Sequence, residues 1–262
     1  MDTKQLDDKI KTLMKYRNPD DPLRYIANLI KDDYIAKLNN DIMNCNKCTA
    51  CNSNVKSVGY GNVNSKILIV NEPIVQVEYN TLIKYNENIT TARDDIFYDK
   101  FSQYLKLINA NVDYLYFIRC INCFVKKSVF NRSTNKEEIK QCVPNTEELK
   151  SCFYNYIEKY IDFLQPQVII CLGSVASNLF HLMSNNNEMF SLMNNRGKVF
   201  KYKNIDVMPT YSLSFFDTKS KMEDKDIVNQ YKYEFVIDLY NAFSIEKAKN
   251  PNSNIGNIYI NQ

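Results

Sequence analysis

Four of the eight cysteines in the 262-residue chain have a spacing that suits the ligands of one metal centre. Cys45 and Cys48 form a C-x-x-C pair just ahead of the first predicted strand. Cys123 ends a second hydrophobic run, and Cys152 lies near the start of a helical stretch. A buried iron–sulfur cluster needs thiolates that converge from separate elements, and zinc is the alternative metal for four thiolates. Four unrelated buried thiols are the other interpretation, because free cysteine is among the most buried residue types.

Other motifs follow these cysteines in a characteristic order. Glu72 comes directly after the apolar run at 66–70, and Val-Gly-Tyr-Gly at 58–61 precedes that run. Three further motifs are Pro-x-Val-Ile-x-x-Leu-Gly-x-x-Ala at 166–176, Asn-Arg-Gly at 195–197 and Met-Pro-Thr-Tyr at 208–211. In this order and at these spacings the chain resembles the iron–sulfur (family 4) class of uracil-DNA glycosylases, over roughly residues 44 to 245.

The resemblance, and not the spacing alone, selects a 4Fe–4S cluster as the cofactor. It implies that Cys45, Cys48, Cys123 and Cys152 are the ligands. The cluster would staple the chain and shape a loop that faces DNA, without redox chemistry.

Two cysteines compete for the last ligand position. Cys142 follows Asn-Arg at 131–132 at a spacing like that of the family, whereas Cys152 begins a helix that continues to Pro166, as in the family. We prefer Cys152 and keep Cys142 as the alternative.

The resemblance also implies a pocket that flips a base out of the duplex and hydrolyses its N-glycosidic bond. Glu72 and Ser212 take the catalytic positions, where Glu72 would orient water. Asn71, Phe97 and Arg119 take the base-binding positions, and Phe97 would stack on the flipped base. The alternatives are a capping role for Glu72 and a core position for Phe97.

Two of these positions differ from the family pattern. Arg119 stands where the family has an Asn that reads the edge of uracil, and Arg offers donors only. Ser212 replaces the His that would stabilise a departing uracil anion, and a hydroxyl bears no charge. Arg119 is therefore expected to pair with Glu72, to bind a phosphate or to bind a modified base. The only histidine, His181, is expected at the surface or at a helix cap.

DNA contacts are expected at two places. Residues 124–145 look like an insertion, whose Lys126, Lys127 and Arg132 would neutralise phosphates; a solvated loop with a charged helical turn is the alternative. Phe215 and Phe216 follow the Pro-Thr-Tyr motif on a predicted loop, where apolar wedges hold a duplex open.

Strands and helices alternate along the chain, which favours a three-layer α/β/α sandwich with a mostly parallel central sheet. Strands are predicted at 67–70, 114–121, 168–172, 198–202 and 205–209. Helices are predicted at 98–110, 146–164, 174–183 and 224–247. Such sheets place their sites at the carboxyl ends of the strands, where Glu72, Arg119 and Ser212 lie.

Composition sets the wider frame. Apolar residues at 45% and charged residues at 24% are ordinary for a globular protein, and the net charge of +3 does not by itself indicate nucleic-acid binding. No apolar run approaches the ~20 residues that span a bilayer, and the polar N-terminus does not look like a secretory signal. We expect a helical extension at 1–43, a glycosylase-like domain at 44–248 and a flexible tail at 249–262.

The functional expectation is therefore a cytoplasmic, DNA-associated glycosylase that excises uracil or, in preference, a modified base. The alternative is a catalytically inactive module of the same fold that binds DNA or protein. The N-terminal helices are a candidate surface for a protein partner.

Overall fold

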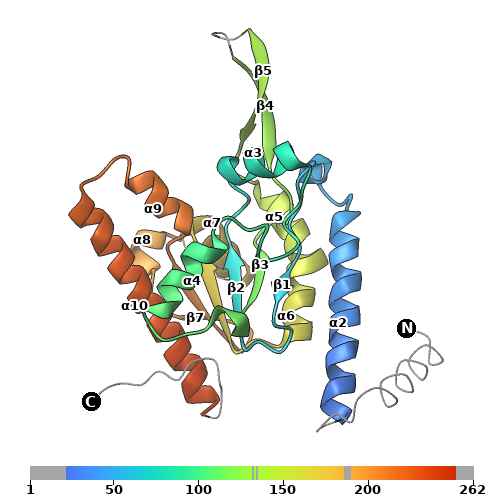
Figure 1. Ribbon diagram of the computed structural model, residues 1–262, viewed down its shortest axis with the longest axis vertical. Coiled ribbons are helices and arrows are strands. Elements are labelled where there is room, and N and C mark those ends of the chain that lie inside the picture. The colour runs from blue at the N-terminus through green and yellow to red at the C-terminus, as the bar shows by residue number, and fades with distance from the viewer. Residues whose placement is uncertain (1–21, 132, 134, 186–189, 252–262) are drawn as a thin grey trace, which may run out of the picture.

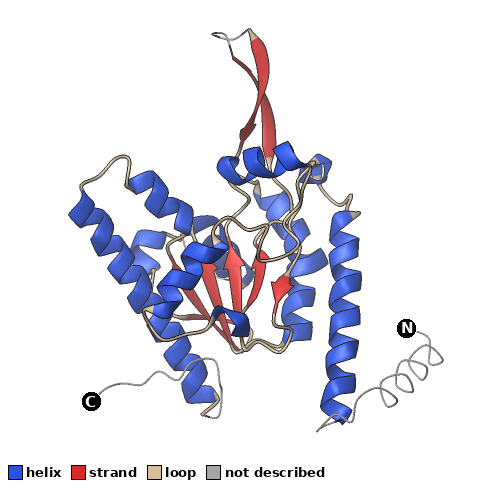
Figure 2. Ribbon diagram, viewed as in Figure 1, coloured by secondary structure: helices blue, strands red, loops and turns tan. Residues whose placement is uncertain are grey.

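The computed structural model describes residues 22–131, 133, 135–185 and 190–251, with the backbone alone for 22–27. A six-stranded sheet in the order β1-β3-β2-β6-β8-β7 forms its centre (Figures 1 and 2). Its strands are β1 (Tyr60–Gly61), β2 (Ile67–Asn71), β3 (Tyr116–Arg119), β6 (Val168–Leu172), β7 (Phe200–Tyr202) and β8 (Ile205–Thr210). The pairings β3–β2, β2–β6 and β6–β8 are parallel, and the two edge strands are antiparallel. The predicted mostly parallel sheet is confirmed.

Helices cover both faces of this sheet, which is why β6 is buried along its whole length. The helices are α2 (Pro22–Met43), α3 (Gln76–Tyr85), α4 (Tyr98–Lys106), α5 (Thr146–Cys152), α6 (Glu158–Leu164), α7 (Ser174–Met183), α8 (Leu192–Asn195), α9 (Leu213–Lys219) and α10 (Lys225–Lys249). Short helical turns are η1 (Thr49–Asn52), η2 (Val112–Tyr114) and η3 (Phe153–Ile157), which joins α5 to α6. One hydrophobic cluster joins the sheet to α2, α5, α6 and α7, and a second joins it to α4, α9 and α10. The expected three layers are therefore present.

The N-terminal extension contributes one long helix within the described residues. Leu38 and Ile42 of α2 are buried against the main body, and Tyr34 stacks on Phe163 of α6 at 4.0 Å. Lys56 closes the end of this helix, because its Nζ donates to the carbonyl of Met43 at 2.7 Å. The predicted first helix, before Pro19, lies outside the described residues, as does most of the predicted tail.

Residues 126–141 form a β-hairpin, so the alternative of a solvated loop with a charged helical turn is wrong here. Strand β4 (Lys126–Asn131) pairs with β5 (Lys136–Gln141) and projects away from the main body (Figure 1). Its base is tied to α3 by two reciprocal hydrogen bonds. The backbone N–H of Gln76 donates to Oε1 of Gln141 at 2.9 Å, and that of Gln141 donates to Oε1 of Gln76 at 2.7 Å.

None of the helices in the described ranges has both the length and the apolar composition that crossing a bilayer would require.

Candidate active site at the strand ends

Three segments meet at the carboxyl ends of β2, β6 and β8. Glu72 follows β2, Gly173 follows β6 and Ser212 follows β8. Gly173 has φ +89°, and a Cβ at this position would lie 3.1 Å from Cβ of Ser212 and 3.5 Å from Cβ of Glu72. Glycine is favoured here both by the backbone conformation and by the close approach of the two neighbouring segments. The sheet therefore brings the two predicted catalytic residues together.

Glu72 carries the chemistry of this meeting point. Its half-buried carboxylate accepts hydrogen bonds from the hydroxyls of Ser214 and Ser212. Burial raises the pKa of the Glu72 carboxyl to about 7, although the two hydroxyls and the charge of Arg119 oppose the rise. A carboxyl that titrates near neutrality can accept a proton from water and is suited to general base catalysis.

Ser212 has a structural task as well. Its Oγ accepts the backbone N–H of Phe215 at 3.3 Å, so the residue caps the N-terminus of α9. Serine is among the preferred residues at this position because its oxygen satisfies a free helical N–H. Ser212 thus fixes both α9 and the carboxylate of Glu72.

Arg119 ends β3 and is almost completely buried, with 2% of its side chain exposed. Its Nη2 lies 2.5 Å from Oε1 of Glu78 and 3.3 Å from Oδ2 of Asp95. Its Nη1 donates at 3.2 Å both to Oε2 of Glu78 and to the backbone carbonyl of Glu72. The expected pairing of the Arg119 and Glu72 side chains is therefore wrong: Arg119 donates to the backbone carbonyl of Glu72, while Glu78 and Asp95 bind the guanidinium charge. These contacts use the Nη hydrogens, so Arg119 holds the strand ends and is not free to contact a base.

The two acids reach Arg119 from segments far apart in sequence. Glu78 lies in the first turn of α3 and accepts the N–H of Val75 at 3.0 Å. Burial raises the pKa of the Glu78 carboxyl, and the charge of Arg119 opposes this rise. Asp95 lies just before α4 and accepts the hydroxyl of Tyr60 at 2.8 Å. Sequence reasoning missed Asp95, because an acid in a polar loop carries no motif.

The remaining predicted base-binding residues border this cluster. Asn71 is half-buried, and its Nδ2 donates to Oδ2 of Asp95 at 3.5 Å. Phe97 precedes α4 and donates its N–H to Oδ1 of Asp95 at 2.9 Å. Its ring is half-buried and packs against the second hydrophobic cluster. Both residues therefore lie near Arg119, because each donates a hydrogen bond to Asp95, which in turn binds Arg119.

The two adjacent phenylalanines lie on helix α9, so the predicted loop is wrong at this point. Phe216 is 1% exposed and belongs to the core, which removes it from any surface contact. Phe215 is half-buried and stacks on Tyr211 at 4.6 Å with an angle of 3° between the rings. Only Phe215 keeps a solvent-facing part that a ligand could contact.

A second arginine cluster supports the end of β8. Nη1 of Arg196 binds both carboxylate oxygens of Asp238, at 2.8 and 2.9 Å, and its Nε lies 3.0 Å from Glu234. Thr210 donates to Asp238 at 2.6 Å, and the guanidinium of Arg196 lies 5.6 Å from the ring centre of Tyr211. The Asn-Arg-Gly and Pro-Thr-Tyr motifs are therefore held together by α10, and they position Ser212. The histidine, His181, packs instead between Phe190 and Phe200.

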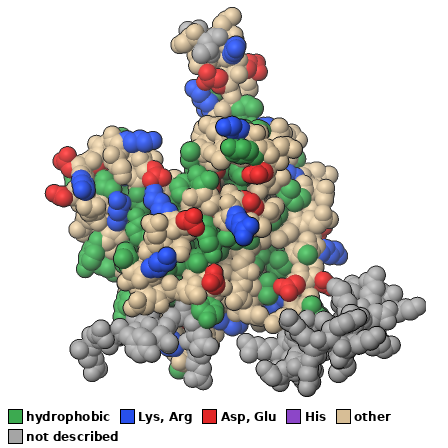
Figure 3. All heavy atoms as spheres, in the orientation of Figure 1, with side chains coloured by type: hydrophobic (Ala, Val, Ile, Leu, Met, Phe, Trp, Pro, Cys, Tyr) green, Lys and Arg blue, Asp and Glu red, His purple; other side chains and the backbone are tan. Residues whose placement is uncertain are grey.

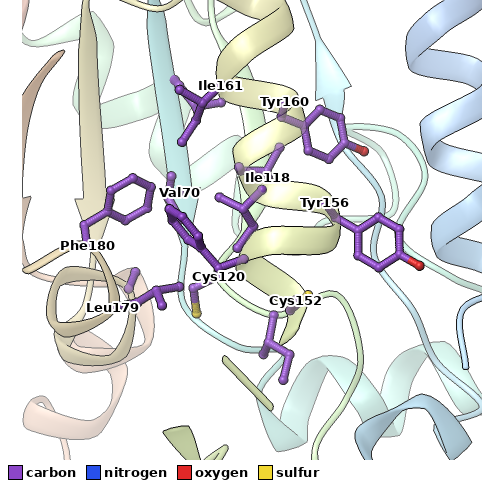
Figure 4. Close-up of a cluster of buried hydrophobic side chains, with 14 of the residues drawn as sticks. Val70, Ile118, Cys120, Cys152, Tyr156, Tyr160, Ile161, Leu179 and Phe180 are labelled. Atoms are coloured by element: carbon purple, nitrogen blue, oxygen red, sulfur yellow. The ribbon is translucent and has the colours of Figure 1, made fainter. Parts of the chain in front are cut away.

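The predicted cluster cysteines gather in one region. Cys123 and Cys152 are buried, and Cys45 and Cys48 pack half-buried against the same hydrophobic cluster. Figure 4 shows Cys152 within this cluster, near Cys120. Burial raises the pKa of the Cys123 thiol to about 12; the charge of Lys56 lowers it, and the thiols of Cys45 and Cys48 raise it further.

Backbone N–H groups point at two of these sulfurs. Sγ of Cys152 accepts the N–H of Asn122 at 3.4 Å, and Sγ of Cys45 accepts that of Lys47 at 3.5 Å. The thiols of Cys48 and Cys123 both raise the pKa of the Cys152 thiol. Cys142, the alternative ligand, donates its backbone N–H to the carbonyl of Val125 at 2.9 Å. Among the described residues, no three His, Cys, Asp or Glu side chains are close enough together to hold a metal ion.

The predicted DNA-binding cations lie on the hairpin. Lys127 is exposed and Lys126 is half-buried, whereas Arg132 lies outside the described residues. Strand pairing places Lys127 opposite Lys140 and Asn131 opposite Lys136, so three exposed lysines share one face. Figure 3 shows basic and acidic side chains along the projecting hairpin.

A comparison with protein families identifies one match. The family model described as "Uracil DNA glycosylase superfamily" matches residues 58–235, which include the strand-end site and the Arg119 cluster; of the second arginine cluster, Arg196 and Glu234 lie within the match and Asp238 lies just beyond it. No curated protein matches the chain significantly.

Proposed function

Because the chain belongs to the uracil DNA glycosylase superfamily, we propose that it is a DNA glycosylase whose catalytic carboxylate is Glu72. One observation carries this proposal. The carboxylate of Glu72 is held by two hydroxyls and has a pKa of about 7, while Glu78 and Asp95 bind the arginine that could have neutralised it. In this proposal Glu72 is the general base at the strand ends.

The proposed reaction follows from the chemistry of this carboxylate. A base flipped out of the duplex would place its C1′ near Glu72, and departure of the base leaves positive charge on the sugar. Ionised Glu72 stabilises that charge and accepts the proton of the attacking water. The hydroxyls of Ser212 and Ser214 keep the carboxylate oriented.

The proposed base is a modified one, and uracil is a poor substrate. Arg119 has given its Nη donors to carboxylates and to a backbone carbonyl, so it does not replace an Asn that reads uracil. Ser212 cannot supply the charge of a histidine, and losing one such donor typically costs ~10²–10³ in rate.

The hairpin is proposed as the DNA-contacting element. Lys127 and Lys140 lie directly opposite each other, an arrangement that like charges disfavour within a hairpin, and Glu138 at 3.7 Å from Nζ of Lys140 offsets only part of the repulsion. A polyanion would relieve this repulsion, and a two-stranded ribbon fits the major groove of duplex DNA. Lys126, Arg132 and Phe215 remain proposed contacts of the same kind.

Salt dependence of binding tests the hairpin. Replacing Lys127, Lys136 and Lys140 with alanine should lower the slope of log K against log salt by about 3, since each lost phosphate contact contributes ~0.9. A matched control replaces three exposed lysines elsewhere: Lys37, Lys221 and Lys225. Equal slopes in the two triple variants would exclude the hairpin from the DNA interface.

The four gathered cysteines are proposed to hold a 4Fe–4S cluster, which would staple α5 and the segment after β3 to the end of α2. Among the described residues no three of these side chains are close enough together for one metal ion, so a cluster would have to draw the four thiols closer. Two features favour it: backbone N–H groups already point at Cys45 and Cys152, and the charge of Lys56 lowers the pKa of the Cys123 thiol. Anaerobically purified protein should contain about four irons per chain. Cys152→Ser should abolish the cluster absorption and Cys142→Ser should not; the opposite result would assign the last ligand to Cys142.

Base release tests the enzymatic proposal. Duplexes that each contain one modified base are incubated with the protein, and strand cleavage after alkali measures excision. Glu72→Gln should reduce release by at least about a hundredfold, whereas the exposed control Glu87→Gln should not change it. Release that persists in Glu72→Gln would remove Glu72 from the mechanism.

A non-catalytic module is the second candidate, and one observation favours it. Three ionisable side chains, those of Arg119, Glu78 and Asp95, are buried together at the strand ends, where a base would be read. DNA binding that is unchanged in Glu72→Gln, together with no release from any duplex, would establish this alternative. A protein partner for the N-terminal helices also stays a prediction.

A further inference from the structure

The electric charge of the strand-end site is unbalanced toward the negative. The positive charge of Arg119 lowers the pKa of the Glu72 carboxyl, and the negative charge of Glu78 raises it. Asp95 adds another carboxylate at 3.3 Å from the guanidinium of Arg119. The site therefore contains three acids, Glu72, Glu78 and Asp95, and one cation. The charge of that cation is more than neutralised before any ligand binds.

Whether a negatively charged site promotes base release depends on the charge of the departing base. A neutral base such as uracil takes the electron pair of the broken bond and leaves as an anion, which needs a cation or strong donors. A base alkylated on a ring nitrogen is already positive in DNA, and the same electron pair makes it neutral. Negative surroundings hinder the first departure and favour binding of the second base.

We propose that the base released at this site carries a positive charge in DNA, as a base alkylated on a ring nitrogen does. This inference rests on the proposed function, since it names the substrate class of the same site. The bond between C1′ and the base nitrogen breaks, and its electron pair neutralises the base. Water forms the new C1′–O bond, and its proton passes to the carboxylate of Glu72.

The neighbouring polar groups agree with this assignment. The hydroxyls of Ser212 and Ser214 donate to Glu72, and Ser212 also caps α9, so they supply no positive charge to a leaving anion. Nε of Arg119 lacks a partner, but it is buried with the rest of that side chain. Carboxylates and hydroxyl oxygens suit a cationic ring better than an anionic one.

Release from three matched duplexes tests the substrate class. Each duplex contains one 7-methylguanine, which is cationic, one hypoxanthine or one uracil, and spontaneous loss is subtracted. Wild-type protein should release 7-methylguanine at least about a hundredfold faster than the two neutral bases, a ratio that one missing donor would produce. The release should be lost in Glu72→Gln.

A charge substitution makes the test independent of the intrinsic reactivity of the bases. Ser214 is less buried than Ser212, so Ser214→His places a titratable cation beside Glu72 with little risk to folding, and Ser214→Asn is the neutral control. The rate ratio of 7-methylguanine to uracil should fall at least about tenfold in Ser214→His relative to Ser214→Asn. An unchanged ratio would overturn the inference.

The outcomes separate this inference from the proposed function. Neutral bases released as fast as 7-methylguanine, in a reaction that needs Glu72, would overturn the inference and leave the glycosylase proposal standing. No release from any of the three duplexes, or from the wider panel of modified bases, would overturn both.

Discussion

Two arginine clusters flank the candidate site, and they have the same composition in different surroundings. Arg119 binds Glu78 and Asp95 with side chains that are at most 2% exposed. Arg196 binds Glu234 and Asp238, but Arg196 and Glu234 are each about a quarter exposed, at 23% and 24%. Burial of charge costs several kcal/mol per ion unless every group is paired, and water lowers that cost at a half-exposed site. The Arg119 cluster is therefore the more fragile of the two.

The difference also separates the tasks of the two clusters. The Arg196 cluster ties α10 to β8 and so places Ser212. The Arg119 cluster ties α3 and the segment before α4 to β3, and it sets the charge around Glu72. One cluster fixes geometry, whereas the other fixes both geometry and electrostatics.

Removing the buried cation should have the largest effect. Arg119→Met leaves two buried carboxylates without a partner and should destabilise the protein by about 3–5 kcal/mol. Urea denaturation measures the change. The triple variant Arg119→Met, Glu78→Gln, Asp95→Asn should recover most of the loss, because no unpaired charge remains. If Arg119→Met costs no more than Arg196→Met, burial is not what distinguishes the clusters.

Glu72 lies beside the buried cluster, and burial raises the pKa of its carboxyl, so its ionised form should cost stability at neutral pH. Its folded pKa of about 7 exceeds the ordinary value of 4.5, so the folded state holds the proton more tightly than the unfolded chain. Stability is therefore lost as the pH rises from about 4.5 through 7. Glu72→Gln should stabilise the protein at pH 8 by up to about 3 kcal/mol, and much less at pH 5. Glu87→Gln is the exposed control, and equal shifts at both pH values would contradict the raised pKa.

A side chain at Gly197 should destabilise the Arg196 cluster, because this glycine packs closely against Asp238. Gly197 has φ +71°, and a Cβ there would lie 2.5 Å from Oδ1 of Asp238, which Arg196 and Thr210 hold in place. Gly197→Ala should cost about 2 kcal/mol, from backbone strain and this contact. Thermal unfolding checks it against Lys198→Ala at the exposed neighbouring position. A neutral result would mean that Asp238 moves freely.

Removing the second arginine should have the smallest effect. Arg196→Met should cost about 1–2 kcal/mol, since water replaces part of the lost hydrogen bonds. Asp238 is the exception, because burial raises its pKa while the hydrogen bonds from Thr210 and Arg196 oppose the rise. The loss in Arg196→Met should therefore be larger at pH 8 than at pH 4, as urea titrations at the two pH values would show. A loss that is independent of pH would mean that Asp238 is solvated.

Much of the fold follows from patterns that are local in sequence. The runs at 67–70 and 168–172 are apolar on both faces, as strands covered by two helical layers must be. The hairpin at 126–141 was not predicted, because its lysines and glutamates obscure the alternation of polar and apolar residues that is typical of a strand. Helix α3 was missed for a related reason, since half of its residues are polar.

The residues of the site also fall into those that the sequence predicts and those that it does not. Glu72 and Ser212 could be found from the sequence, because each directly follows a strand that the pattern predicts. The partners of Arg119 could not be found, because no local pattern indicates that Glu78 and Asp95 converge on β3. Phe216 was misplaced because the polar residues around it concealed a short buried helix. Contacts between distant segments are what sequence patterns fail to encode.

The Arg119 cluster also constrains how this chain can evolve. Its three members come from positions 78, 95 and 119, which lie on separate elements, so they cannot be exchanged as one segment. Replacing Arg119 alone leaves two buried carboxylates without a cation, and that intermediate on the way to a neutral site is therefore less stable than either end. Fitness effects at the three positions are thus mutually dependent, and a lineage that has acquired this arginine is held to its acids.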